Sequence, residues 1–532
     1  MKIGIIGAGW YGCHLALTLK EAGHDVEIYE KKHEIFSGIS GKFGIRLHQG
    51  PHYPRSASTR ESCRRGFTRF MNRYPDLVIP HEYSIYGLGA RDSDGNPPKI
   101  DREHFDDVCE ESDNCNEIDH EKFGFDGLLS AHDVKEPSIA LGKRLRTNFT
   151  GYLEKAGIPV HLDFDVTKLE SMGEKVLLGN ETSSKEFDKI INASSYQTHV
   201  QKDADFPFDM EVVYQPCLAL VYKDKKAKKR PFSFIVMDGW FPCLMPQIDN
   251  DDKPVQEERS RKYILTHGKW TIMGSYDTAS EANSILAELS DSFVEDQIKV
   301  PSENEMKRFW PAFADKERFE YIGWEGTVLA KLKTKSEFRS ALTYEDKGNV
   351  IHIIPGKVSN IFDAEDEVFS LLYKENVLNR NGYSYVMGGV LDQATTEITE
   401  KPAENEANTA NLRTLEEIKR LPQRMPKTPM FNRSTLIQPK IKDDQSTQTD
   451  NAIVNLASPN YSFVLKCIAG ILACSTLLAV AILTIPVTGV TYSAMISAAA
   501  VVGVSYCGYR LFANVMERPQ QAITVEHRPS FA

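Results

Sequence analysis

Three glycines near the N-terminus have the spacing of a phosphate-binding loop. They form the pattern G-x-G-x-x-G within the letters GAGWYG. The residues of this loop are Gly7, Ala8, Gly9, Trp10, Tyr11 and Gly12. In such loops the first glycine permits a tight turn, the second lets the backbone approach a pyrophosphate, and the third allows a helix to pack on a strand. Glu30 follows at roughly the 20-residue offset at which an acid bonds a ribose hydroxyl. The sequence therefore predicts a dinucleotide site, and the acid disfavours a 2′-phosphate.

The elements around the loop must position these residues. Residues 2–6 are typical of a short strand, residues 13–22 of a helix that stops at Gly23, and residues 25–29 of a second strand. A signal peptide is the alternative interpretation, because Lys2 precedes an apolar run. The glycines would weaken an inserted helix, so the order strand, turn, helix, strand favours the nucleotide site.

The segment after Glu30 is rich in glycine and serine and contains Arg46 and His48. A histidine titrates near neutral pH and can take a proton from a substrate. An arginine offers a bidentate fork for a carboxylate, which makes Arg46 and Arg339 candidates for substrate binding. A structural role remains the alternative for each of the three.

The loop at the extreme N-terminus and the histidine-containing segment resemble the D-amino-acid-oxidase-like family of FAD-dependent oxidoreductases. Three later stretches are similar to parts of that family: residues 156–170, 187–200 and 348–368. The resemblance implies that FAD, not NAD, is the resident cofactor and that His48 and Arg46 lie at the flavin. It also implies cofactor contacts from Glu30, Lys31, Ser40, Val166, Ala193, Gly356, Lys357, Ser359 and Asn360, besides the loop.

The resemblance implies an α/β fold in which a Rossmann-like FAD-binding domain carries an antiparallel β-sheet substrate domain. The head is expected at 1–395, with FAD-binding parts at about 1–75, 150–200 and 337–385 and the substrate domain at about 76–149 and 201–336. Residues 212–222, 232–237, 263–266 and 270–274 have the composition of strands of this sheet.

The net charge and the cysteine spacing argue against several other classes of function. A net charge of −11 over 532 residues disfavours a nucleic-acid partner. The 9 cysteines include no C-x-x-C pair, so neither a zinc site nor a disulfide framework is indicated, no metal is expected, and we expect reduced thiols.

The C-terminal part differs from the head. Residues 396–460 are polar and are expected to form a flexible linker. Residues 461–516 contain two uncharged stretches, 467–485 and 490–509, joined by a Pro/Gly turn, which predicts a transmembrane helical hairpin. Its basic flanks place both ends, and hence the head, on the cytoplasmic side. Small residues in the hairpin are compatible with self-association, and residues 517–532 form a short polar tail.

The sequence thus favours a membrane-anchored FAD-dependent oxidoreductase that takes a hydride from a small amine or hydroxy acid to the flavin. A flavin-dependent non-redox mutase is one alternative, although such mutases usually have a Gly-Gly pair just after the acid, which is missing here. A degenerate flavin fold that acts as a membrane-tethered interaction protein is the other.

Overall fold

The computed structural model describes residues 1–112, 115–200, 206, 209–228, 230–249 and 261–402. The predicted hairpin at 461–516, the tail and all of the predicted linker from residue 403 onward lie outside the described residues. Within the described ranges, no helix has the length and apolar character needed to cross a membrane.

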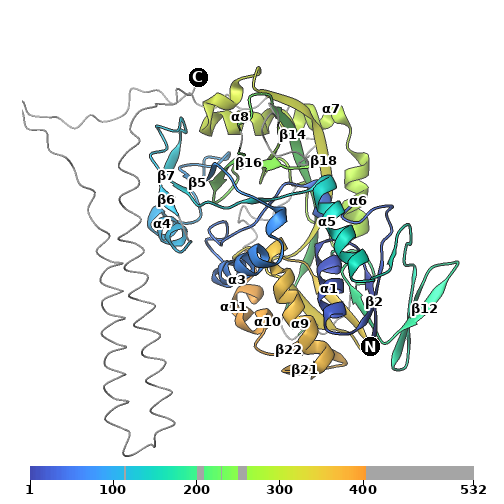
Figure 1. Cartoon of the computed structure of the whole chain (residues 1–532). Coiled ribbons are helices and arrows are strands. Elements are labelled where there is room, and N and C mark those ends of the chain that lie inside the picture. Colours follow the sequence, from blue (N-terminus) through green and yellow to red (C-terminus); the bar gives the residue numbers. More distant parts are fainter. Residues whose placement is uncertain (113–114, 201–205, 207–208, 229, 250–260, 403–532) are drawn as a thin grey trace, which may run out of the picture. The chain divides into compact units, whose positions relative to one another are not determined.

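An eight-stranded sheet forms the centre of the nucleotide-binding half (Figure 1). Its strand order is β21-β22-β19-β20-β13-β1-β2-β9. The strands are β1 (Lys2–Ile6), β2 (Asp25–Tyr29), β9 (Val160–His161), β13 (Lys189–Asn192), β19 (Leu342–Glu345), β20 (Val350–Ile354), β21 (Val377–Arg380) and β22 (Tyr383–Val386). The five strands from β20 to β9 run parallel, as a Rossmann-like domain requires. In this register Ile6 lies opposite both Tyr29 and Asn192, so the three strands end together at the glycine loop.

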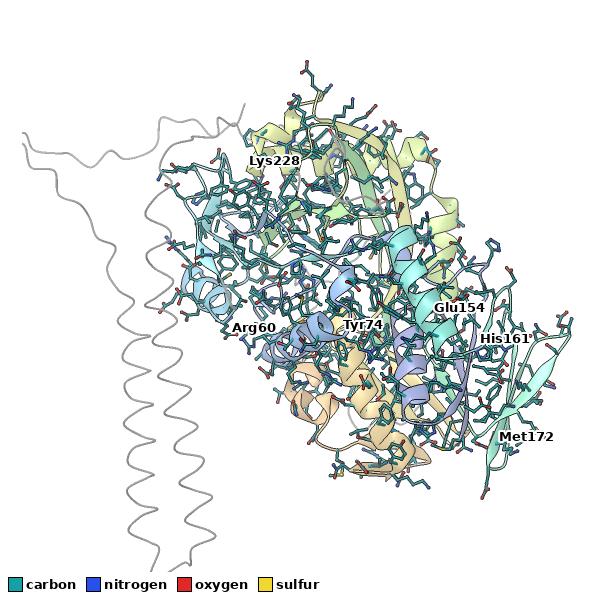
Figure 2. All side chains as sticks on the ribbon, in the orientation of Figure 1. Arg60, Tyr74, Glu154, His161, Met172 and Lys228 are labelled. Atoms are coloured by element: carbon teal, nitrogen blue, oxygen red, sulfur yellow. The ribbon has the colours of Figure 1, made fainter. Side chains whose placement is uncertain are left out.

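Helices cover one face of this sheet and a small antiparallel sheet covers the other. The helices are α1 (Trp10–Glu21), α3 (Ala57–Arg73), α5 (Gly142–Lys155) and α9 (Ile361–Tyr373). The small sheet consists of β10 (Lys168–Met172), β11 (Lys175–Gly179) and β12 (Ser184–Phe187). Figure 2 shows Met172 at the outer end of this sheet, where its side chain is exposed. Apolar side chains are buried on both faces of the central sheet.

The second half contains another eight-stranded sheet, with the order β18-β14-β17-β16-β15-β5-β7-β6. The strands are β5 (Tyr83–Gly89), β6 (Asn116–Glu117), β7 (Leu128–Asp133), β14 (Val212–Asp224), β15 (Phe232–Met237), β16 (Pro242–Gln247), β17 (Arg261–His267) and β18 (Phe319–Leu332). Neighbouring strands are antiparallel except β15 and β5, which are parallel. The expectation of a purely antiparallel sheet is therefore wrong at this pair, where two separate chain segments meet.

The predicted strands of this sheet are found, with one exception. Residues 270–274 form no strand, and only an isolated bridge joins Ile272 to Cys217. The helical elements of this half are α4 (Arg102–Glu110), α6 (Ala279–Glu288), α7 (Asp291–Phe293), the π-helix Val294–Lys299 and α8 (Val300–Phe309). Apolar side chains from α8 and the π-helix are buried against the sheet.

Short elements complete the head. They are α2 (Ile39–Lys42), β3 (Ile45–Arg46), β4 (Val78–Ile79), β8 (Ser138–Ile139), α10 (Val390–Gln393), α11 (Thr395–Thr399) and the 3₁₀ helices Pro75–Leu77, Pro311–Ala314 and Val358–Asn360. Two of the predicted boundaries fall inside ordered elements. The boundary at 149/150 lies within α5, and Ile398 of α11 is buried, so the packed head continues beyond residue 395.

Candidate active site

The glycine loop turns sharply between β1 and α1. Gly7 has a φ of 101°, a conformation that side chains other than glycine rarely adopt. A Cβ atom at Gly12 would lie 1.9 Å from the carbonyl oxygen of Gly7, so only glycine lets the helix approach the loop this closely. A Cβ atom at Gly9 would lie 3.0 Å from the Ser40 hydroxyl. That hydroxyl accepts a hydrogen bond from the Trp10 amide at 3.3 Å.

Glu30 lies beside this loop at the end of β2. Its carboxylate accepts hydrogen bonds from the Ala8 amide at 2.8 Å and from the Lys32 amide at 3.0 Å. The side chain of Lys31 is exposed. The backbone of the glycine loop, the N-terminus of α1 and a fixed acid together fit the pyrophosphate and ribose of a dinucleotide.

The ring of Trp10 is packed in the core of the nucleotide-binding half. It packs edge-on against Phe36 and Phe149, with ring centroids 5.4 and 5.1 Å away, and close to Tyr74. The side chain is almost completely buried. Trp10 therefore anchors the start of α1, and its contribution to a phosphate site is its backbone.

Tyr11 joins the glycine loop to a turn near the end of the head. Its hydroxyl accepts a hydrogen bond from the Gly356 amide at 2.9 Å and donates one to the Lys357 carbonyl at 2.9 Å. A Cβ atom at Gly356 would lie 2.4 Å from the Ala341 amide nitrogen, so this turn needs glycine. The side chain of Asn360 accepts from the Lys357 amide at 2.6 Å and closes the turn.

The remaining predicted cofactor residues lie around the glycine loop and the turn at Gly356. Ala193 packs against the loop, since a Cβ atom at Gly7 would lie 2.8 Å from its carbonyl oxygen. Val166 is buried against the small sheet, and its carbonyl accepts a hydrogen bond from His199. Ser359 is fully buried, and its carbonyl oxygen lies against Gly66 of α3.

A cavity of about 470 Å³ lies between the two halves of the head. The predicted residues that line it are Trp10, Tyr11, Ser40, Arg46, His48, Arg339, Gly356 and Lys357. The predicted residues outside its lining are Gly7, Ala8, Gly9, Gly12, Glu30, Lys31, Val166, Ala193, Ser359 and Asn360. The first group brings the loop, the predicted catalytic pair and the late turn together around one space.

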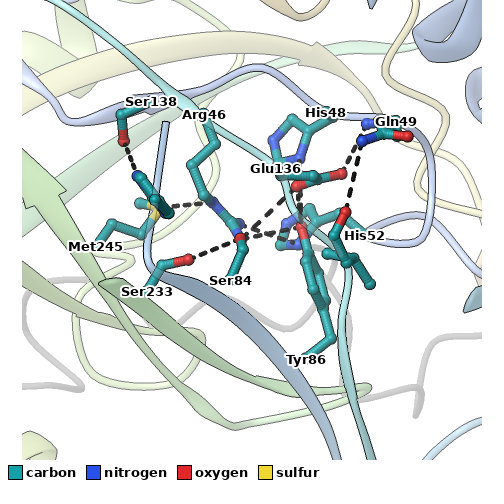
Figure 3. A network of polar contacts seen from close by, with 12 residues as sticks. Arg46, His48, Gln49, His52, Ser84, Tyr86, Glu136, Ser138, Ser233 and Met245 are labelled. Atoms are coloured by element: carbon teal, nitrogen blue, oxygen red, sulfur yellow. Dashed lines mark hydrogen bonds and ion pairs between the residues drawn. The ribbon is translucent and has the colours of Figure 1, made fainter. Parts of the chain in front are cut away.

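Arg46 and His48 belong to a buried polar network (Figure 3). Glu136 accepts hydrogen bonds from the Tyr86 hydroxyl at 2.6 Å and from the Gln49 amide at 2.7 Å, and it lies 3.1 Å from Nδ1 of His48. Arg46 donates to the Tyr86 hydroxyl at 2.9 Å. Because that hydroxyl accepts from Arg46, its own proton points to Glu136.

The network controls the charge and orientation of His48. Burial lowers the pKa of His48 well below its usual value, and the nearby cations Arg46 and Lys357 lower it further. Burial raises the pKa of Glu136, while Arg46 and the Tyr86 hydroxyl oppose that rise. With the carboxylate ionised, Nδ1 of His48 donates to it, and the lone pair of Nε2 is left as a proton acceptor. No partner of Nε2 is found in the part of the chain that the structure describes.

Several cationic side chains besides Arg46 line the same cavity. Lys331, Arg339 and Lys357 line both the main cavity and an adjoining one of about 130 Å³. Burial lowers the pKa of Lys331 to about 8, with Arg339 adding to the effect, and it lowers the pKa of Lys357 to about 8. Nε of Arg339 is buried without a hydrogen-bond partner among the described residues. The carboxylate of Glu337 lines the same two cavities, and the three cations outnumber it, so this part of the site is suited to an anionic group.

Sequence reasoning missed four residues of this site: His52, Tyr86, Glu136 and Lys331. His52 stacks on His48 with ring centroids 4.9 Å apart. Lys331 follows three apolar residues, 328–330, which is a signal of a buried strand, whereas Glu136 stands between Lys135 and Pro137 and its sequence neighbours do not indicate burial. Among the described residues, no group of three His, Cys, Asp or Glu side chains is arranged to hold a metal ion.

Comparisons with known proteins agree with this geometry. Residues 5–65 match the model of the NAD(P)-binding Rossmann-like domain. The chain is 47% identical to the FAD-dependent monooxygenase kojA of Aspergillus flavus over 422 residues, which cover 78% of this chain and 97% of that protein. It is 27% identical to the FAD-dependent monooxygenase FPY4 of Fusarium mangiferae over 381 residues, covering 70% and 92%. Glycine oxidase from Geobacillus kaustophilus shares the fold, with a TM-score of 0.51, 11% identity and coverage of 74% and 96%.

Fold, loop and relatives define an FAD-dependent oxidoreductase, and FAD is its cofactor. The prediction of FAD is confirmed, and so is the prediction of an enzyme. Within this class, the chain belongs to the family of the FAD-dependent monooxygenase kojA.

Proposed function

We propose that the protein oxidises a small amine or hydroxy acid by hydride transfer to FAD. The observation that carries this proposal is one cavity that holds both cationic side chains and a proton acceptor. Lys331, Arg339 and Lys357 offer positive charge to a carboxylate, and His48 offers a neutral imidazole in the same cavity.

Bound FAD supplies the two-electron acceptor. The Ser40 hydroxyl and the amides at the start of α1 would hold its pyrophosphate, and Glu30 its ribose. Nε2 of His48 takes the proton of the substrate hydroxyl or amine, and Glu136 keeps the ring in the tautomer that can accept it. Lys331 and Arg339 hold the substrate carboxylate and so fix its orientation.

Anaerobic mixing of the flavin-loaded protein with small amines and hydroxy acids tests the reaction. Loss of flavin absorbance identifies a substrate. Lys331→Met and Arg339→Met should then lower kcat/KM about 10- to 150-fold, chiefly through KM, because each removes a charge-assisted hydrogen bond of about 1.5–3 kcal/mol. Lys333→Met is the matched control, since Lys333 pairs with Glu211 at the surface. If the same substrates without a carboxylate react equally well, the anion-binding role is wrong.

Oxygenation is the second candidate function, because two relatives are named monooxygenases. The two reactions differ in the fate of O₂. Turnover under ¹⁸O₂ should leave the organic product unlabelled if the protein is an oxidase and should place one ¹⁸O atom in it if the protein is an oxygenase. Release of hydrogen peroxide in amounts equal to substrate consumed would support the first reaction.

The membrane anchor remains part of the proposal. The two uncharged stretches within residues 461–516 and their basic flanks support a hairpin with the head and the C-terminus on the cytoplasmic side. Deletion of everything after Pro459 should release the flavin-loaded head from membranes into the alkaline-washed supernatant, whereas the full chain stays in the pellet. Full-length protein that is released by the same wash would contradict the anchor.

A further inference from the structure

Two cysteines lie together at the end of α4, outside the cavity described above. Cys109 is buried in the last turn of the helix, and Cys115 lies just before β6 and is half-buried. Cys115 packs against the apolar cluster that contains Cys109, and a hydrogen bond between the two thiols shifts the pKa of both. No element of the proposed oxidation uses them.

A histidine contacts Cys115, and a carboxylate contacts that histidine. Nδ1 of His132 lies 3.5 Å from the Cys115 sulfur, and Nε2 of the same ring lies 2.8 Å from the Asp106 carboxylate. Asp106 belongs to α4, one turn before Cys109, and His132 belongs to β7. A thiol, an imidazole and a carboxylate in this order form an activated nucleophile.

The electrostatics agree with this geometry. Hydrogen bonds from Cys109 and then from His132 lower the pKa of Cys115, against the effects of burial and of the Asp133 charge. Burial opposes ionisation of His132, yet its bonds to Cys115 and Asp106 raise its pKa. The other charged or titratable groups that face the cluster are Arg102, Asp133 and Glu136.

The remaining described cysteines lack these features. Burial raises the pKa of Cys217 to about 11 and also raises that of Cys13, Cys63 and Cys243. Reactivity of a cysteine follows its thiolate fraction and its accessibility. Cys115 differs from all four in its lowered pKa, and from Cys13, Cys63 and Cys217 also in accessibility, whereas Cys243 is likewise half-buried.

We propose that Cys109 and Cys115 form a peroxide-sensitive thiol–disulfide pair in which Cys115 reacts first. The Cys115 sulfur attacks one oxygen of hydrogen peroxide, the O–O bond breaks, and the departing hydroxide takes a proton from His132 and leaves as water. The product is the sulfenic acid of Cys115. The Cys109 sulfur then attacks the Cys115 sulfur, the S–O bond breaks, and the hydroxide leaves as a second water with the Cys109 proton. Two thiols are oxidised to one disulfide and one peroxide is reduced to two waters.

A single tryptic peptide tests the proposal. Residues 103–122 lie between Arg102 and Lys122 and contain both cysteines. The reduced, flavin-loaded full chain is treated with hydrogen peroxide and its free thiols are alkylated. The protein is then digested with trypsin, and the peptide masses are measured by mass spectrometry. This peptide should lose two hydrogens and escape alkylation, while the peptides with Cys63, Cys217 and Cys243 remain alkylated. If both thiols of the peptide stay free, or if all cysteines react at one rate, the proposal is overturned.

Variants separate the two steps. Cys109→Ser should stop the reaction at the sulfenic acid, which dimedone traps on Cys115, and Cys115→Ser should prevent both products. His132→Asn should slow peroxide consumption at least about 10-fold, as expected when a group that stabilises the thiolate is lost. Asp106 acts through His132 as a positioning residue. Asp106→Asn should therefore move the midpoint of the pH profile of Cys115 alkylation upward, toward the ordinary value of about 8.5.

Flavin content and melting temperature report folding of each variant. The wild-type alkylation rates of Cys115 and Cys217 provide a measurement without any variant. Cys115 should react at least about 10-fold faster at pH 7, because more of it is thiolate. Equal rates would overturn the activated role of Cys115 even if the cysteine variants do not fold.

Discussion

Two buried histidines of this protein have the same kind of partner and opposite ionisation behaviour. His48 lies 3.1 Å from Glu136, and His132 lies 2.8 Å from Asp106. Both side chains are almost inaccessible, with exposed fractions of 6% and 2%. The pKa of His48 is lowered and that of His132 is raised.

Burial disfavours the protonated form of both rings, and the second neighbours of each ring then act in opposite directions. Arg46, Lys357 and Arg339 act on His48, and their positive charges oppose a fourth one on the ring. His132 instead faces a thiol that ionises easily. A carboxylate partner therefore orients a histidine in both places but does not decide its charge. The first ring is suited to accept a proton and the second to stabilise an anion.

Replacement of His48 should give the largest effect. His48→Asn removes the proton acceptor of the cavity, so flavin reduction by the substrate should slow about 10²–10⁴-fold while FAD remains bound. Stopped-flow absorbance measures this rate. His352→Asn is the matched control, since His352 is also buried beside a carboxylate, Asp346, but does not line the cavity. An unchanged rate in a flavin-loaded His48→Asn protein would assign His48 a structural role only.

Replacement of Glu136 should give a smaller loss. Glu136→Gln removes a charged acceptor and offers an amide that no longer selects the tautomer of His48. A hydrogen bond to a charged group is worth about 1.5–3 kcal/mol, which corresponds to a loss of about 10- to 150-fold in the reduction rate. The same variant should not slow the peroxide reaction at Cys115, because the Glu136 charge raises the pKa of Cys109 and its loss makes that thiol easier to ionise. A parallel loss at both sites would show that the two histidines are not independent.

Removal of a neighbouring cation should change the pH profile more than the maximum rate. Lys357→Met takes away a positive charge that disfavours protonated His48, so the pKa of His48 should rise. The acid limb of the reduction profile should move to higher pH with it. FAD content is measured first, because Lys357 belongs to the turn that is hydrogen-bonded to Tyr11 of the glycine loop. An acid limb that stays in place would mean that another group controls it.

The smallest effect concerns stability. His132 has a raised pKa in the folded state, so its contribution is present below the unfolded value of about 6.5 and is lost as the pH rises through the folded value. His132→Asn should therefore lower Tm by about 2 °C more at pH 6 than at pH 9. His48 has the opposite sign, because its lowered pKa makes acid conditions favour the unfolded chain. Identical differences at both pH values would contradict the raised pKa of His132.

The cofactor loop was predictable because its residues are neighbours in the chain. Gly7, Gly9 and Gly12 are specified by local geometry, and Glu30 lies only one helix and one strand away. The two histidine sites were not predictable in the same way. Glu136 is 88 positions from His48, and their contact depends on how β8 pairs with β3 and β4.

The thiol pair illustrates the same limit. Cys109 and Cys115 have no recognised spacing, and His132 comes from a different strand. The composition of residues 270–274 predicts a strand, but in the structure they form only an isolated bridge to Cys217. Long-range register, which sequence periodicity does not contain, decided each of these cases.

The Tyr11 hydroxyl has a consequence for the order of events during synthesis. It connects the first loop of the protein to Gly356 and Lys357, which leave the ribosome about 345 residues later. The glycine loop is among the first parts to emerge, yet its hydrogen bonds to the turn at Gly356 can form only after that turn has been translated. Flavin capture should therefore be a late, whole-head event, and a ribosome-bound chain that is stalled before residue 356 should carry no flavin.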